Sequence, residues 1–359
     1  MCDTWLKFSM RRIFLNSAWP IMGVHYNHRG SLLLTRFLAF FFVILLVGGY
    51  PSTAKAAITC TATMTSIAFG SVNVLPGTII STTGTETITC SGATANTTYR
   101  FCTDITAGTH VSANQRQMAS GSNRLAFDLY KDAAHTQPWG NYANNFLGGG
   151  SQNDFTSNAS GNISATITVY ATLAVQQAAI PGSYSEPLNS GASQRLHYGS
   201  LASGGNCSTG GSTANFSFTV TATATTSANV SVSSLAFGSS PSTIASNIDA
   251  TATITVQSTN TTPYSIGLDN GNNVSGSQRR MRLGATFNYV NYGLFTDAAR
   301  SNAWTTTTST TSCTGGASTC ALGTGTGSNQ SVTIYGRVPP QSATAVGTYA
   351  DSVIVTVTF

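Results

Sequence analysis

Charged residues are scarce in this sequence, and their distribution excludes one class of partner. Only 8% of the 359 residues are Asp, Glu, Lys or Arg. The net charge of +5 resides in residues 1–56, which hold six of the 16 basic and one of the 11 acidic residues. The rest of the chain carries ten of each sign. Binding to nucleic acid needs a basic surface for the phosphates, so we expect no nucleic-acid partner.

Catalytic and metal-binding motifs are also missing. The sequence contains no C-x-x-C pair and no G-x-S-x-G turn, and no pair of carboxylates stands out among its acids. His110, His135 and His197 are far apart in the sequence, and we interpret them as solvated loop residues. We therefore predict a protein that is not an enzyme, without catalytic residues, cofactor or metal site.

A leader is visible near the start of the chain. Arg36 precedes the eleven apolar residues 37–47, and Ala54-Lys55-Ala56 fits a small-x-small cleavage site. A membrane anchor is the alternative, but it needs about 20 apolar residues to span a bilayer. We expect residues 1–56 to form a signal-peptide region with an extended N-terminus, and the exported chain to begin at Ala57.

Long stretches with helical periodicity are absent as well. Beyond residue 56 the chain is rich in Thr, Ser, Gly, Ala and Val, and segments such as TETITC, ATITVYATL and FSFTVTATA alternate apolar with polar residues. This alternation predicts an all-β protein of the sandwich type.

An internal repeat divides these strands into two sets. SIAFGSV (66–72) returns as SLAFGSS (234–240), and PGSYSE (181–186) returns as VGTYAD (346–351). We predict two tandem domains, at 57–227 and 228–359. Trp139 has a counterpart in Trp304, which favours packing of the shared fold over ligand binding for both residues.

Six cysteines follow residue 56. An even number in an exported chain favours three disulfides over metal binding. The first two cysteines align with Ala228 and Val256 in the second copy, so both are lost together, as expected for one bridge. The last two lie close together in a Gly/Thr-rich loop, which leaves the middle two. The predicted pairs are Cys60–Cys90, Cys102–Cys207 and Cys313–Cys320.

The end of the chain, VGTYADSVIVTVTF, alternates like a strand with one buried face. In the first copy, residues 187–224 follow the matching PGSYSE and include FSFTVTATA, which either closes the sandwich or replaces a strand equivalent to VIVTVTF. The second copy has only SVIVTVTF. We expect the C-terminal sandwich to lack its last strand and to accept one from elsewhere. The residues predicted for this donor-strand groove are Val353, Val355, Val357 and Phe359.

The pattern C…FG…TITC in the first copy and the terminal GTYADSVIVTVTF resemble the spore coat protein U domain family, over nearly all of residues 57–359. The second copy departs from the family pattern because it lacks the first cysteine pair. Family members form subunits of archaic chaperone–usher pili. The resemblance implies incomplete immunoglobulin-like sandwiches, which receive a strand first from a periplasmic chaperone and then from an adjacent subunit. It also implies passage through an outer-membrane usher to the cell surface.

One feature favours a particular position in such a pilus. Only Ala57, Ile58 and Thr59 precede Cys60 in the expected exported chain, too few for the donor segment of a shaft subunit. The chain therefore resembles a two-domain tip adhesin, with surface attachment and biofilm formation as its expected function. A structural coat or shaft protein without a binding role is the alternative.

We expect loops of the first domain to bind an abiotic or host surface, because the copies differ there. Residues 141–155, 176–182 and the segment after PGSYSE place apolar side chains among turn-forming residues. The alternative is that these side chains fold back onto the sandwich. The candidates are Tyr142, Phe146, Leu147, Phe155, Ala178, Ala179, Ile180, Pro181, Leu188, Leu196, Tyr198 and Leu201.

Overall fold

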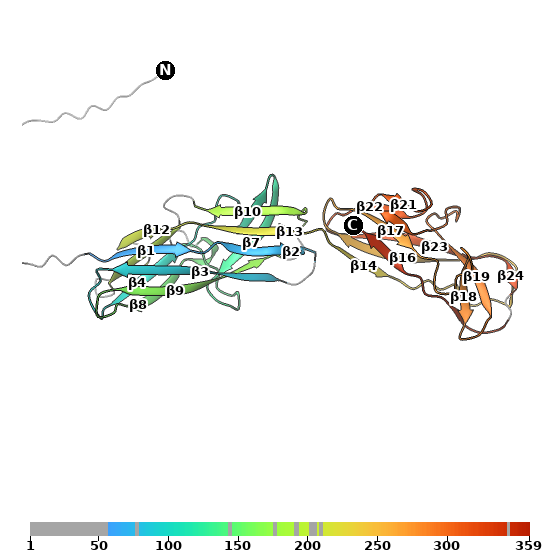
Figure 1. Ribbon diagram of the computed structural model, residues 1–359, viewed down its shortest axis with the longest axis horizontal. Helices are drawn as coiled ribbons and strands as arrows, with labels where there is room; N and C mark the ends of the chain where they lie inside the picture. The colour runs from blue at the N-terminus through green and yellow to red at the C-terminus, as the bar shows by residue number, and fades with distance from the viewer. Residues whose placement is uncertain are drawn as a thin grey trace, which may run out of the picture. The chain divides into compact units, whose positions relative to one another are not determined.

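The computed structural model describes residues 57–75, 79–142, 146–174, 178–189, 194–200, 207, 211–342 and 345–359, without the side chains of Phe146 and Thr308. The expected signal-peptide region and Leu201 lie outside these residues. Regular structure in the described part is β-strand (Figure 1), apart from one 3-10 turn, η1 (Phe146–Gly148). Over the same residues, no helix has the length and apolarity needed to cross a membrane. Among the described residues, no set of three or more His, Cys, Asp or Glu side chains is arranged to hold a metal ion.

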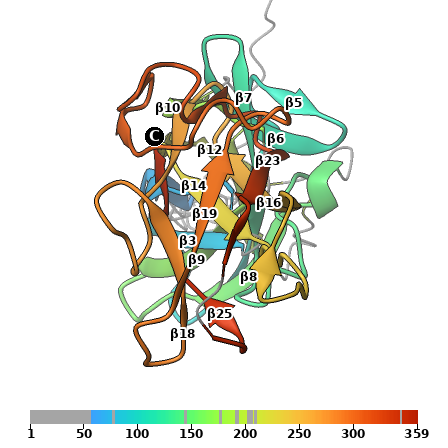
Figure 2. The same ribbon diagram turned by 90° about the vertical axis from the view of Figure 1, so that its right-hand side faces the viewer.

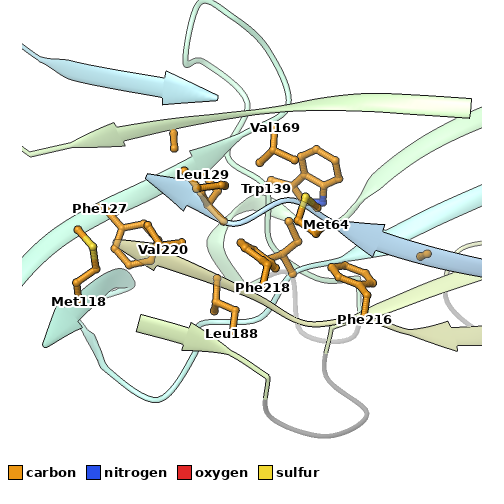
Figure 3. Packing of buried hydrophobic residues seen from close by; sticks show 14 of the residues in the cluster. Met64, Met118, Phe127, Leu129, Trp139, Val169, Leu188, Phe216, Phe218 and Val220 are labelled. Atoms are coloured by element: carbon orange, nitrogen blue, oxygen red, sulfur yellow. The ribbon is translucent and has the colours of Figure 1, made fainter. Parts of the chain in front are cut away.

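The first sandwich contains the strands that precede residue 228, and these strands pair only with one another within the described residues. They are β1 (Thr59–Met64), β2 (Ile67–Val72), β3 (Ile80–Ser91), β4 (Thr98–Asp104), β5 (Val111–Ser112), β6 (Gln115–Ser120), β7 (Asn123–Tyr130), β8 (Ser151–Thr156), β9 (Ile163–Leu173), β10 (Gly182–Leu188), β11 (Arg195–Ser200), β12 (Ser212–Asn215) and β13 (Phe218–Ala224). One sheet has the order β1-β3-β9-β7-β6-β10-β13-β2, with β5 beside β6, and the other has the order β12-β11-β4-β8. Side chains from both sheets form one hydrophobic cluster, and Figure 3 shows part of it.

The second sandwich contains the remaining strands and has its own hydrophobic cluster. They are β14 (Ala228–Val232), β15 (Thr243–Ile244), β16 (Ile248–Ser258), β17 (Pro263–Leu268), β18 (Arg279–Leu283), β19 (Tyr289–Phe295), β20 (Thr307–Ser309), β21 (Ser312–Cys313), β22 (Ala321–Thr324), β23 (Asn329–Val338), β24 (Gln341–Ser342), β25 (Tyr349–Ala350) and β26 (Val355–Thr358). The main sheet has the order β14-β16-β23-β19-β18-β25, in which β18 and β25 lie side by side (Figure 2). A second sheet has the order β22-β17-β26, and β15-β24 and β20-β21 form short pairs. The prediction of an all-β chain with two sandwiches is confirmed.

All three predicted disulfides are present, Cys60–Cys90, Cys102–Cys207 and Cys313–Cys320. One detail of the sequence alignment was wrong. In the first sandwich Cys60 lies opposite Cys90. In the second, the residue opposite Ala228 is Ser258, and not Val256. The same offset aligns the Thr65–Thr85 and Ser233–Thr253 backbone hydrogen bonds. Aligning the shared letters TIT of the two copies shifts the second copy by two residues from the alignment that strand pairing gives. The shift is easily made because Thr and Ile alternate along both strands.

Each sandwich contains the same buried tryptophan and arginine. Trp139 and Trp304 are fully buried, and their indole N–H groups donate to Thr103 O at 2.9 Å and Ile266 O at 3.2 Å. Arg116 donates to Trp139 O from within the first sandwich, and Arg279 donates to Trp304 O in the second. The packing role predicted for both tryptophans is confirmed. The paired arginines were not predicted, although both copies contain a Gln-Arg dipeptide at this position.

A buried carboxyl group distinguishes the first sandwich from the second. Glu86 on β3 is fully buried, and its only described hydrogen bond comes from the Thr103 hydroxyl at 2.8 Å. Burial raises the pKa of Glu86 to about 7, because the carboxylate loses its hydration and gains little in return. In the register defined by the Thr65 and Ser233 bonds, the second sandwich has Ile254 at this position.

The first sandwich should therefore lose stability as pH rises. Because the folded-state pKa of Glu86 lies above the unfolded value of 4.5, its contribution is fully present below pH 4.5 and is lost as pH rises through 7. We expect an unfolding free energy lower by about 2.5 kcal/mol at pH 8 than at pH 5. Trp304→Phe leaves Trp139 as the fluorophore of the first sandwich, so urea unfolding of that variant reports this value.

Glu86→Gln should remove most of this pH dependence. A smaller remainder is expected from Asp104 and Asp128, since burial also raises the pKa of both. Asp154→Asn serves as the control at an exposed carboxylate. A profile equally steep with Glu86→Gln would contradict the assignment.

Candidate functional site: an open groove in the second sandwich

The closing strand of the first sandwich shows what such a domain needs. β13 runs antiparallel to β10, with Leu188 opposite Phe218, and parallel to β2, with Ile67 beside Val220. Its inward side chains, with Phe216 just before it, are buried and lie in the same cluster as Trp139 and Leu188 (Figure 3). FSFTVTATA is therefore the closing strand, which settles the two alternatives left open by the sequence.

The corresponding place in the second sandwich is a groove. Residues 235–240, which repeat β2, form no strand and leave Leu235 and Phe237 only half-buried. Together with residues 345–349 they line a hollow of about 740 Å³. Its floor contains Ile244, Met281 and Val338. The walls are thus the counterparts of the two strands that hold β13 in the first sandwich.

The final segment shows the same lack of cover. Leu196 on β11 faces Thr103, whose carbonyl accepts from Trp139, and Val357 on β26 faces Ile266, whose carbonyl accepts from Trp304. These contacts make Leu196 and Val357 equivalent. Leu196 is fully buried, whereas Val357 is only half-buried.

Three further pairs show the same difference, one in this register and two aligned by the PGSYSE and VGTYAD repeat, and in each the second sandwich is the more exposed. Tyr198 is 5% exposed and its counterpart Phe359 is 46% exposed. Tyr184 and Leu188 are buried, whereas Tyr349 and Val353 are half-buried. Val353, Val355 and Val357 pack on the core of the second sandwich, but neither they nor Phe359 line the hollow.

The first strand of the second sandwich is also uncovered. Val230 and Val232 on β14 are 47% and 45% exposed, whereas Ala62 and Met64 at the same positions of β1 are each 7% exposed. The uncovered surface therefore runs from β14 past residues 235–240 on one side, and along residues 345–359 on the other. Uncovered apolar side chains along the edge of a sandwich are what a β-strand acceptor presents.

The structure changes several of the surface-loop predictions. Ala179 and Leu188 are buried in the core, as are Leu196 and Tyr198, so the prediction that they contact a surface was wrong. Leu188 points inward because its side chain lies on the core face of β10. Phe155 is half-buried, with its ring centroid 5.6 Å from that of Phe101.

The other candidates remain at or near the surface. Ala178 is exposed, and Tyr142, Leu147, Ile180 and Pro181 are half-buried. The backbone N–H of Tyr142 donates to Asp104 Oδ1 at 2.9 Å, which fixes the start of that loop. The side chain of Phe146, and Leu201 altogether, lie outside the described residues.

His110 and His197, which we interpreted from the sequence as solvated, are each paired with a carboxylate. His110 Nδ1 lies 2.6 Å from the carboxylate of Glu186, a buried residue that also accepts the backbone N–H groups of Thr109 and His110. His197 Nε2 lies 3.3 Å from Asp104 Oδ2. The solvated reading of His110 and His197 was wrong, because the partners come from distant strands that sequence spacing does not bring together.

Matched substitutions should reveal the uncovered edge. Met64→Thr removes a buried side chain and places a hydroxyl in the core, so we expect the first sandwich to lose about 2–4 kcal/mol. Val232→Thr at the equivalent exposed position should cost less than about 0.5 kcal/mol. Urea unfolding in Trp304→Phe and Trp139→Phe backgrounds reports the two sandwiches separately. Equal costs at the two positions would mean that β14 is covered.

The likeness of this chain to known proteins is distant. No curated protein matches the chain. Similar solved structures include a chaperone–tip adhesion subunit pre-assembly complex from archaic chaperone–usher Csu pili of Acinetobacter baumannii, with 16% identity, 84% of this chain and 100% of that chain covered, and a TM-score of 0.47. CfaE, the adhesive subunit of CFA/I fimbria of enterotoxigenic Escherichia coli, is 8% identical, with 72% and 86% covered and a TM-score of 0.23. These low scores carry no functional argument.

The family assignment comes from the sequence. The model of the Spore Coat Protein U domain matches residues 50–190 and again residues 214–356. The two matches cover most of the chain, and each includes most of the strands of one sandwich. They agree with the prediction of a protein that is not an enzyme. The chain belongs to the Spore Coat Protein U domain family.

Proposed function

We propose that this chain is the tip adhesin subunit of an archaic chaperone–usher pilus. In this proposal the second sandwich, residues 228–359, accepts a β-strand from a periplasmic chaperone and then from the adjacent subunit, after passage through the usher. The first sandwich, residues 57–227, attaches the cell to a surface and so promotes biofilm formation. The expected route is export by the signal peptide and display at the cell surface.

The open groove is the observation that carries this proposal. It lies where β13 lies in the first sandwich, and its sides are residues 345–349, which lead into β25, and residues 235–240, which repeat β2.

The energy of filling the groove is large enough to drive assembly. Burying several Val- or Ile-sized side chains contributes about 5–10 kcal/mol at 25 cal/mol per Å². This is comparable with the whole stability of a domain, about 5–15 kcal/mol. A strand in the groove would therefore decide whether the second sandwich is stable.

Attachment in this proposal uses the apolar side chains that stay at the surface of the first sandwich. Leu147 and Ile180 are half-buried and Ala178 is exposed, each next to turn residues. Equal numbers of acidic and basic residues beyond residue 56 leave no net charge to repel a surface of either sign.

A donor peptide should stabilise the second sandwich. We expect refolding of the full chain with a peptide of sequence STANFSFTVTATA, residues 212–224, to raise the melting temperature reported by Trp304. At a peptide concentration about 100 times the dissociation constant, the gain is about 2.7 kcal/mol, or roughly 10 °C. A control peptide with Asp in place of Phe218 and Val220 should have no effect. An unchanged melting temperature with both peptides would refute the acceptor role.

Surface substitutions should reduce attachment without affecting pilus assembly. Leu147→Ser with Ile180→Ser removes apolar contact area, and we expect attachment of piliated cells to plastic to fall several-fold. Phe287→Ser in the second sandwich is the control, because Phe287 is 88% exposed and lies outside the proposed binding domain. Undiminished attachment by normally piliated cells would move the binding site to polar faces of the first sandwich.

Labelling of fibres separates this proposal from a structural role. With an antibody against this chain, electron microscopy of pili should show label at the fibre tips. Label along the whole shaft would support the alternative of a structural subunit without a binding role.

A further inference from the structure

The strand pair β12–β13, which closes the first sandwich, is nearer in sequence to the first strand of the second sandwich than to β11. Only residues 225–227 separate β13 from β14, whereas residues 201–211 separate β11 from β12. β12 and β13 nevertheless pair with β11 and β10, within the first sandwich. In the sequence β13 directly precedes the second sandwich, but in the structure it completes the first.

The extent of the family match supports the same division. The first match ends at residue 190, before β11, and the second match begins at residue 214, inside β12. The second family unit therefore includes β13 as its leading segment, followed by the sandwich with the open groove.

The two sandwiches need the same kind of strand. In the first, β13 lies antiparallel to β10 and parallel to β2 and buries Phe218, Val220 and Ala222. In the second, residues 345–349 and 235–240 repeat these two walls and border the hollow. β13 thus has the place in the first sandwich that the proposed donor strand would have in the second.

We infer that the chain is two pilin units fused in one polypeptide, in which the second unit uses its donor strand, β12–β13, to complete the first unit of the same chain. The inference rests on the proposed function in assigning a donor strand to this kind of unit.

The second disulfide holds this strand in place. Cys207 lies five residues before β12 and is bonded to Cys102 on β4. β12–β13 is therefore anchored at its start by the disulfide and at its end by β14. Both anchors oppose exchange of the strand into the groove of a second copy.

Protease cleavage of the full chain on either side of the strand tests the inference. Both variants carry Cys102→Ser and Cys207→Ser, and a protease site is inserted either within residues 202–206 or within residues 225–227. Cleavage at 202–206 should leave two pieces that co-elute in size-exclusion chromatography until denaturant is added, because the strand bonds the first sandwich without a covalent link. Cleavage at 225–227 should release the pieces at once, with at least about tenfold more free N-terminal piece.

Each arm has an outcome that overturns the inference. Separation after cleavage at 202–206 in native buffer would show that β12–β13 does not hold the first sandwich. Co-elution after cleavage at 225–227 would show that other contacts hold the pieces together. Adding Val220→Asp to the 202–206 variant should release the pieces, whereas Thr223→Asp, at an exposed position of the same strand, should not.

A final measurement separates this inference from the proposed function. The C-terminal piece from the 202–206 variant, purified in denaturant and refolded, carries both a donor strand and a groove, so it should form concentration-dependent polymers. If the cleaved pieces behave as expected but this piece stays monomeric, the use of the strand within the chain stands and the acceptor role of the groove fails.

Discussion

In the first sandwich, β13 lies hydrogen-bonded between β10 and β2 while its alternate side chains complete the core. Backbone groups at a sheet edge and apolar side chains at an open core both need a partner, and one strand supplies both at once. In the second sandwich the corresponding residues are half-buried or exposed, from Val230 on β14 to Phe359 at the other side. The two copies differ most in whether this one strand is present.

Features outside the closing strand explain how both copies keep the same architecture. Each has a buried tryptophan that donates to the strand beneath it and a buried arginine that donates to the tryptophan carbonyl. Each sandwich also has a carboxylate, Glu186 or Asp351, that accepts hydrogen bonds from a loop of the same sandwich. Glu186 accepts from His110, and Asp351 accepts from the Asn273 side chain at 2.9 Å and from the Tyr292 hydroxyl at 2.7 Å. These polar contacts organise the core independently of the missing strand.

The sparse charge of the chain fits an assembly built on strands. Few ion pairs compete with backbone hydrogen bonds and apolar burial, and one fully buried carboxyl, Glu86, has its pKa raised to about 7 instead of pairing with a base. A fibre whose subunits join by main-chain hydrogen bonds and apolar side chains depends little on salt, since neither interaction is screened as charges are. The first sandwich is closed, and the second offers the groove.

Sequence alone determined the all-β class, the two copies, the three disulfides and the packing role of Trp139 and Trp304, because period-2 alternation, repeats and paired cysteine losses are local or collinear signals. It did not place Leu188, Leu196 and Tyr198, which looked like loop residues but lie on inward faces of β10 and β11. It also missed the pairing of His110 with Glu186 and of His197 with Asp104. Those positions depend on which strands lie opposite one another, and only the tertiary structure decides that. The same holds for the groove: its walls are residues more than 100 positions apart, brought together by the sheets.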